Sequence, residues 1–214
     1  MPLYQLCFSR TGAAAWLAHL DLMRMFERGF RRADLPMVWS QGFNPRPSMV
    51  FALPIGLGIE AEAEIMDFEL EESLSEDEIM QRLSKAFTRD IGISSVTQIT
   101  PRPMSLMAMV KEAVYRYEGP GAGLSFQTCW DHETDFTLEI VRKGKEKQID
   151  LQDYVLDLEI VTDSVFRIRS KAGSQSNMRP EWPLELLSQR GYSSREAALD
   201  IRIIREKLLL ESET

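Results

Sequence analysis

The chain has 214 residues, a net charge of −8 and 44% hydrophobic residues, so it can bury a core and form two domains of roughly 100 residues each. Cys7 and Cys129 form no CxxC pair, and His19 and His132 are too few for a histidine-rich metal site. This composition excludes a disulfide scaffold, a zinc knuckle and an iron–sulfur cluster held by the chain's own thiolates, and we expect no metal and no cofactor.

The amino-terminal segment has neither the basic region nor the long apolar core of a secretory signal. No apolar run approaches the roughly 20 residues that a membrane-spanning helix needs. We therefore expect a cytoplasmic protein with no membrane partner.

The charge is distributed unevenly along the chain. Residues 1–50 carry six arginines and three acids, a net charge of +3, whereas residues 51–100 carry three bases and eleven acids, a net charge of −8. The overall charge argues against nonspecific nucleic-acid binding, but it leaves room for a compact basic site on an acidic body.

The first predicted elements are a strand at Leu3–Phe8 and an amphipathic helix at His19–Ala33. At 100° per residue, the apolar side chains of this helix fall within an arc of about 120°. The opposite face carries four arginines: Arg24, Arg28, Arg31 and Arg32. The pattern predicts a helix with one apolar and one cationic side.

Pro36 ends this helix, and a loop at Gly42–Pro47, constrained by proline and glycine, precedes a strand at Met49–Leu53. A further strand is predicted at Ile59–Leu70. Ser75 is then the expected cap of a second helix, which is followed by a strand at Ile91–Ile99.

The order strand, helix, strand, strand, helix, strand is typical of a ferredoxin-like split βαβ unit, which we assign to residues 1–100. Residues 101–214 carry predicted strands at Met109–Tyr117, Phe136–Arg142 and Leu156–Arg169, the last with a polar break at Asp163. A short helix is predicted at Pro183–Gln189, and Leu199–Leu210 is predicted as a closing strand, with a helix as the alternative for its end. This half lacks an obvious first helix. We therefore predict an α+β fold with two ferredoxin-like domains in tandem, the second degenerate.

Two motifs carry a resemblance to a known family. The first is His19-Leu20-Asp21 with the arginines that follow it, and the second is Gly42-Phe43-Asn44-Pro45-Arg46-Pro47. With these motifs the chain resembles the radical-SAM-linked protein family of unknown function. One departure is Ala18, where family members tend to place a serine, because alanine cannot cap a helix through its side chain.

The resemblance implies that such domains are fused to, or encoded beside, radical S-adenosylmethionine (radical SAM) proteins. The genes often lie near one for an RNA-cleaving enzyme of the ribonuclease G and E type. The chain has no three-cysteine cluster of its own, so a partner would perform any radical chemistry. The resemblance implies no established activity.

The candidate binding residues are the four arginines together with Gly42, Phe43, Asn44 and Arg46. Guanidinium groups fit phosphate oxygens, and an aromatic ring beside a cation can stack on a nucleotide. Two alternatives stay open: the arginines form a solvated face paired with nearby acids, and Phe43 fills the core.

His19 is the one candidate for acid–base chemistry, because imidazole titrates near neutral pH. A ferredoxin-like RNA endonuclease can use a histidine at the start of its first helix. The competing interpretation is a buried, hydrogen-bonded histidine that anchors the helix, since His19 projects from the apolar side.

The leading hypothesis is a non-catalytic RNA-binding or substrate-recognition module that works with a radical SAM enzyme. One alternative is a metal-independent endoribonuclease in which His19 acts as general acid or base. Another is a protein-interaction scaffold that docks a radical SAM partner through an exposed strand or an acidic surface, without RNA.

Overall fold

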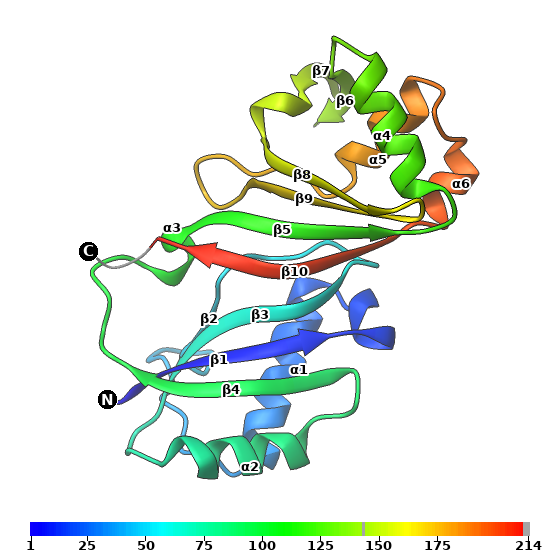
Figure 1. Cartoon of the computed structure of the whole chain (residues 1–214). Coiled ribbons are helices and arrows are strands. Elements are labelled where there is room, and N and C mark those ends of the chain that lie inside the picture. The colour runs from blue at the N-terminus through cyan, green and yellow to red at the C-terminus, as the bar shows by residue number, and fades with distance from the viewer. Residues whose placement is uncertain (143, 212–214) are drawn as a thin grey trace. The chain divides into compact units, whose positions relative to one another are not determined.

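The computed structural model describes residues 1–142 and 144–211, which form two compact units (Figure 1). The first unit contains Met1–Val110 and the chain end beginning at Leu210, and the second contains Lys111–Leu209. The fold is α+β, as the sequence predicts. The division into one domain at residues 1–100 and another at residues 101–214 stays a prediction.

The first unit has the predicted succession of strands and helices, with two short helices added. Its elements are β1 (Leu3–Arg10), η1 (Gly12–Trp16), α1 (His19–Arg32), β2 (Met49–Phe51), β3 (Glu60–Glu69), α2 (Glu76–Ala86), β4 (Ile91–Ile99) and α3 (Leu106–Met109). The strands lie in the order β4-β1-β3-β2, and each neighbouring pair is antiparallel. This is the ferredoxin-like strand order.

Strand β1 is central because its alternating sequence buries one face against the helices. Tyr4, Leu6 and Phe8 are fully buried and belong to one core cluster with the apolar side of α1. The ring of Phe8 lies 4.7 Å, centre to centre, from that of Phe26 on α1. This packing holds α1 against the sheet and turns its other side outward.

Helices α1 and α2 approach closely at Gly29. A Cβ atom at this position would lie 2.3 Å from the ring of Phe87, the residue that follows α2. Ser75 caps α2 as predicted, and its hydroxyl accepts a hydrogen bond from the Glu78 amide at 3.2 Å. Both helices therefore have fixed positions beneath the sheet.

The second unit repeats the same plan with an inserted hairpin. Its elements are β5 (Val110–Glu118), α4 (Ala122–His132), β6 (Thr137–Arg142), β7 (Lys145–Asp150), η2 (Leu151–Asp153), β8 (Val155–Thr162), β9 (Val165–Lys171), α5 (Trp182–Gln189), α6 (Arg195–Leu199) and β10 (Arg202–Leu210). The order β10-β5-β9-β8 corresponds to that of the first unit, and β6 and β7 form a separate pair.

Helix α4 corrects the prediction that the second half lacks a first helix. It begins after Gly121, which adopts a φ of 67°, and Gly123 lets its first turn approach the turn between β8 and β9. Its side chain Phe126 stacks on Phe166 of β9 with the ring centres 4.4 Å apart. The helix thus covers this sheet as α1 covers the first one.

Candidate nucleic-acid interface

Helix α1 exposes its arginines and buries its apolar side. Leu22, Phe26 and Phe30 are buried in the core of the first unit. The residues on the opposite side are all exposed: Arg24, Arg28, Arg31 and Arg32. We call these four residues the arginine stripe, and its position agrees with the periodicity of the sequence.

Two of the four arginines have a carboxylate partner within α1. Arg24 pairs with Asp21 at 3.1 Å, and Arg31 pairs with Glu27 at 2.9 Å. Both guanidinium groups are exposed, and exposed ion pairs contribute only about 0–1 kcal/mol, so a phosphate can compete with the carboxylate, more readily at Arg24 than at Arg31, whose partner Glu27 is half-buried. Arg28 has no hydrogen bond or ion pair to any residue of 1–142 or 144–211.

Arg32 has a different environment at the end of the stripe. Its Nε and Nη2 atoms donate hydrogen bonds to the carbonyl oxygen of Ala86, at 3.2 Å and 2.8 Å. A carbonyl carries no net charge, so Arg32 keeps its full positive charge. The contact also fixes the guanidinium against the end of α2.

The loop Ser40–Arg46 stands on a hydrogen-bonded base. The Ser40 amide donates to the Arg46 carbonyl at 2.8 Å, and the Arg46 amide donates to the Ser40 hydroxyl at 2.9 Å. Below this pair, Trp39 and Pro47 form an antiparallel bridge. The base therefore closes the loop and presents its tip to solvent.

The tip of the loop is fully exposed. Gly42 has a φ of 135°, a conformation that favours glycine. Phe43 has a relative exposure of 105%, so the interpretation that it fills the core is wrong. Asn44 and Arg46 are also exposed, and in the described part of the chain no group pairs with the Arg46 guanidinium.

Arg31 connects the arginine stripe to the loop. Its guanidinium carbon lies 4.9 Å from the ring centre of Trp39, at the base of the loop. Trp39 is half-buried and packs against the core of the first unit. Because of this cation–π contact, the carboxyl end of α1 and the loop form a continuous surface, which we call the α1–loop surface.

His19 lies at the other end of α1 and is only half-buried. Its ring meets Phe51 edge to face, with the centres 5.5 Å apart. It forms no hydrogen bond to another residue of the described ranges, so the interpretation of a hydrogen-bonded anchor is wrong. Burial, and secondarily the positive charge of Arg10, lowers the pKa of His19.

Arg10 fixes the backbone just before α1, where Ala18 cannot cap the helix with its side chain. Its buried guanidinium donates hydrogen bonds of 2.9 Å from Nε to the Ala14 carbonyl and from Nη2 to the Leu17 carbonyl. The Ala18 side chain makes no capping hydrogen bond. Arg10 therefore holds the segment before α1 through backbone carbonyls.

Trp16 is a candidate residue that the sequence reasoning missed. It ends η1, three residues before the start of α1, and has a relative exposure of 72%. It rests against Gly58, whose φ of 77° and missing side chain allow the approach. An aromatic ring is thus exposed near the amino end of α1, while the base of the loop that carries Phe43 contacts Arg31 near its carboxyl end.

Within residues 1–142 and 144–211, no three histidine, cysteine, aspartate or glutamate side chains are grouped so that they could bind a metal ion. The same described residues contain no helix long and apolar enough to span a membrane. The α1–loop surface itself offers guanidinium groups, an amide and an aromatic ring. Its chemistry suits an anionic ligand with flat groups that stack.

Residues 4–180 match the profile of the family described as uncharacterized proteins conserved in bacteria (DUF2344). The chain belongs to this family. The match includes all of the arginine stripe and the loop Ser40–Arg46. No curated protein matches the chain.

Two solved structures are similar over nearly the whole length. A crystal structure of an unknown protein from Galdieria sulphuraria is 12% identical over 98% of this chain and 99% of that chain, with a TM-score of 0.29. A RAMP protein described as binding different RNA substrates is 12% identical over 98% of this chain and 100% of that chain, with a TM-score of 0.26. Scores this low carry no argument about function.

Proposed function

We propose that this member of the uncharacterized family is a non-catalytic RNA-binding module. The observation that carries the proposal is a fully exposed aromatic ring, Phe43, on a loop that contacts an arginine-rich helix. Single exposed apolar residues are common, so the exposure alone does not support a ligand; the support is that this ring lies on a loop whose base contacts an arginine of the helix, where it can stack on a base.

The surface suits single-stranded RNA better than a duplex. A 14-residue helix is about 21 Å long, so the arginine stripe can follow several phosphates of an extended strand. Phe43 can stack on an unpaired base, and Arg46 beside it can contact the adjoining phosphate. In a duplex the bases are already stacked on one another and leave Phe43 without a partner.

His19 does not fit well as the catalyst of RNA cleavage on this surface. On a helical projection it lies about 140° from Arg24 and about 180° from Arg28. A scissile phosphate held by these arginines is therefore remote from the imidazole. The endoribonuclease alternative predicts RNA cleavage in EDTA that is lost on changing His19→Ala, and binding without cleavage is the result that we expect.

The proposed partner is a radical SAM protein, and this part rests on the sequence resemblance alone. Under the proposal, the module delivers a substrate to an enzyme that performs the chemistry. A tagged radical SAM protein encoded beside this chain should co-purify with it after ribonuclease treatment. If the two proteins separate even when RNA is added back, the partnership is refuted.

The test of RNA binding uses fluorescence anisotropy with a short, labelled, single-stranded RNA. The double variant Arg28→Glu, Arg46→Glu removes two cations that have no partner within the described residues, so we expect affinity to fall about tenfold or more. Arg195→Glu is the control, because Arg195 is also an exposed helical arginine without a partner there. Equal losses in both proteins, or no binding by the natural sequence, would contradict the proposal.

A further inference from the structure

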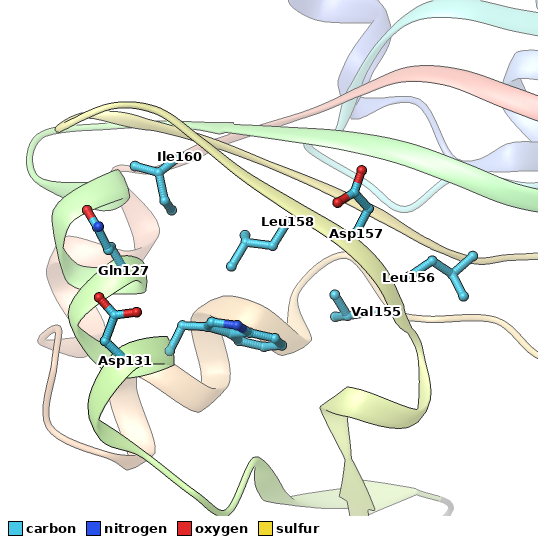
Figure 2. Close-up of a pocket in the computed structure, with 8 residues that line it drawn as sticks. Gln127, Asp131, Val155, Leu156, Asp157, Leu158 and Ile160 are labelled. Carbon is cyan, nitrogen blue, oxygen red and sulfur yellow. The ribbon is translucent and has the colours of Figure 1, made fainter.

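Strand β8 forms one edge of the sheet in the second unit. It pairs with β9, and no other strand of the described chain pairs with its outer edge. Helix α4 runs along the same side, and between the two lies a hollow of about 410 Å³ (Figure 2). A strand edge with free backbone groups beside a hollow is a geometry that accepts an added strand.

The side chains of β8 alternate between two environments. Leu158 and Ile160 point toward α4 and are half-buried, opposite the buried Ile168 and Phe166 of β9 (Figure 2). Asp157 lies on the rim of the hollow and is exposed. An added strand would meet apolar groups on its α4 side and a carboxylate at the rim.

The apolar part of the hollow is large enough for one or two side chains. Its floor includes Trp130, Val155 and Leu158, all half-buried. Leu156 at the rim has a relative exposure of 40% although it belongs to a strand. An apolar side chain entering here would remove these groups from water, at about 25 cal/mol per Å².

The charges around the hollow have one sign. Asp131 on α4 and Asp157 on β8 line it, and no lysine or arginine does. Neither carboxylate has a hydrogen bond or ion pair with another described residue, whereas the nearby Glu159 pairs with Arg167 at 3.2 Å. Two unpaired acids therefore border the hollow, Asp131 on α4 and Asp157 on the rim, and they favour a cationic partner.

We propose that the edge of β8 is a docking site for an extended segment of a partner protein in which apolar residues alternate with lysine or arginine. The segment pairs with β8 through backbone hydrogen bonds. Its apolar side chains enter the hollow against Trp130 and Leu158. Its alternating cations point to the opposite face, where they contact Asp157. The site belongs to the second unit and does not depend on RNA binding.

A second copy of this chain fits the site poorly. Pairing two β8 strands edge to edge would bring Asp157 and Glu159 of one copy close to the same acids of the other. Like charges across adjacent strands are destabilising. The acidic edge therefore disfavours self-association and selects a basic partner strand.

The test uses fluorescein-labelled peptides in which valine or leucine alternates with lysine, and follows binding to the full chain by anisotropy. We expect saturable binding that a central proline abolishes, because proline removes a backbone donor and disrupts the added strand. A peptide with glutamate in place of lysine should bind at least about tenfold more weakly. Equal binding of all three peptides would overturn the proposal.

Protein variants locate the site. Asp157→Lys should weaken binding of the lysine peptide about tenfold and strengthen binding of the glutamate peptide. Asp163→Lys is the matched control, because Asp163 is an exposed acid in the turn after β8 and does not line the hollow. If both variants change binding equally, the peptide responds to overall charge and the assigned site is wrong.

Amide hydrogen exchange distinguishes strand pairing from simple charge attraction, because attraction between charges alone does not slow exchange of the β8 amides. Binding of the lysine peptide should slow exchange within Val155–Thr162, because the amides that point to the outer edge, away from β9, gain hydrogen-bond partners. Sedimentation at increasing concentration examines the competing occupant. Protection of β8 without peptide, together with a concentration-dependent dimer, would assign the edge to a second copy and refute the partner proposal.

Discussion

The two units of this protein share a strand order and present different surfaces. The strand order is β4-β1-β3-β2 in the first unit and β10-β5-β9-β8 in the second, where the hairpin of β6 and β7 is not counted. In the first unit, helix α1 carries the arginine stripe and a closed loop exposes Phe43. In the second unit, helix α4 instead borders a hollow whose unpaired charges are the acids Asp131 and Asp157.

This difference shows that the ferredoxin-like plan fixes where helices and edges lie but leaves their chemistry free. The apolar side of each first helix must pack on its sheet, and that requirement leaves the opposite side unconstrained. The first unit carries cations on this side of its helix, and the second unit places acids beside an unpaired strand edge. We infer that the two units contact different partners.

The largest effect that we expect comes from Gly123, where the second unit allows no side chain. A Cβ atom here would lie 2.0 Å from the Thr162 carbonyl oxygen. Since that oxygen belongs to the backbone, Gly123→Ala should displace α4 from the β8–β9 turn. We expect a loss of about 3 kcal/mol in the free energy of unfolding, measured by urea denaturation.

Gly191→Ala is the control for this change. Gly191 has a positive φ of 79°, which Gly123 does not have, and a Cβ atom at Gly191 meets no atom within 4 Å. Only backbone strain remains, so the expected loss is about 1 kcal/mol. If the two variants lose the same amount, close packing of α4 on the turn is not what holds the second unit together.

An intermediate effect is expected at Phe43, where the first unit exposes an aromatic ring. Phe43→Ala should leave the free energy of unfolding unchanged, because the ring is fully exposed. RNA affinity should fall by about 1–3 kcal/mol through loss of stacking. The slope of log affinity against log salt should stay the same, because no phosphate contact is removed.

Arg28→Ala provides the contrast in the same salt titration. It removes one cation, so the slope should become shallower by about 0.7 for a single strand. Affinity at low salt should fall more than affinity at high salt. If Phe43→Ala alters the slope and Arg28→Ala does not, the roles that we assign to stacking and to charge are reversed.

Much of the first unit could be predicted from the sequence, because its patterns are strong. Alternation in Leu3–Phe8 and the helical spacing after His19 both come from burial on one side, and the structure has both elements. The second unit was harder, because α4 begins at glycines and its sequence contains residues common in strands. Strand β7, Lys145–Asp150, has Ile149 as its single apolar residue and so has no apolar period to detect.

Some features of the candidate site could likewise be predicted from the sequence, and others could not. The exposure of the arginines follows from helical period, and Gly42 in a turn follows from its freedom of φ. The contact between Arg31 and Trp39, and the full exposure of Phe43, depend on how the chain after α1 folds back. The hollow beside β8 required a helix that the sequence did not indicate, so its position was not predictable.

The smallest effect that we expect is in the pH dependence of the free energy of unfolding. Each unit contains one histidine, so His19 and His132 can be compared. Burial lowers the folded-state pKa of His19 below its usual value of about 6.5, so the unfolded chain binds a proton there first as the pH falls. The free energy of unfolding should therefore decrease as pH falls below about 6.5, and this contribution should level off below the folded pKa. His19→Gln should make this part of the pH profile flatter, measured by urea denaturation at a series of pH values. His132→Gln, at the exposed end of α4, is the control, and an equal flattening in that variant would mean that the dependence does not arise at the start of α1.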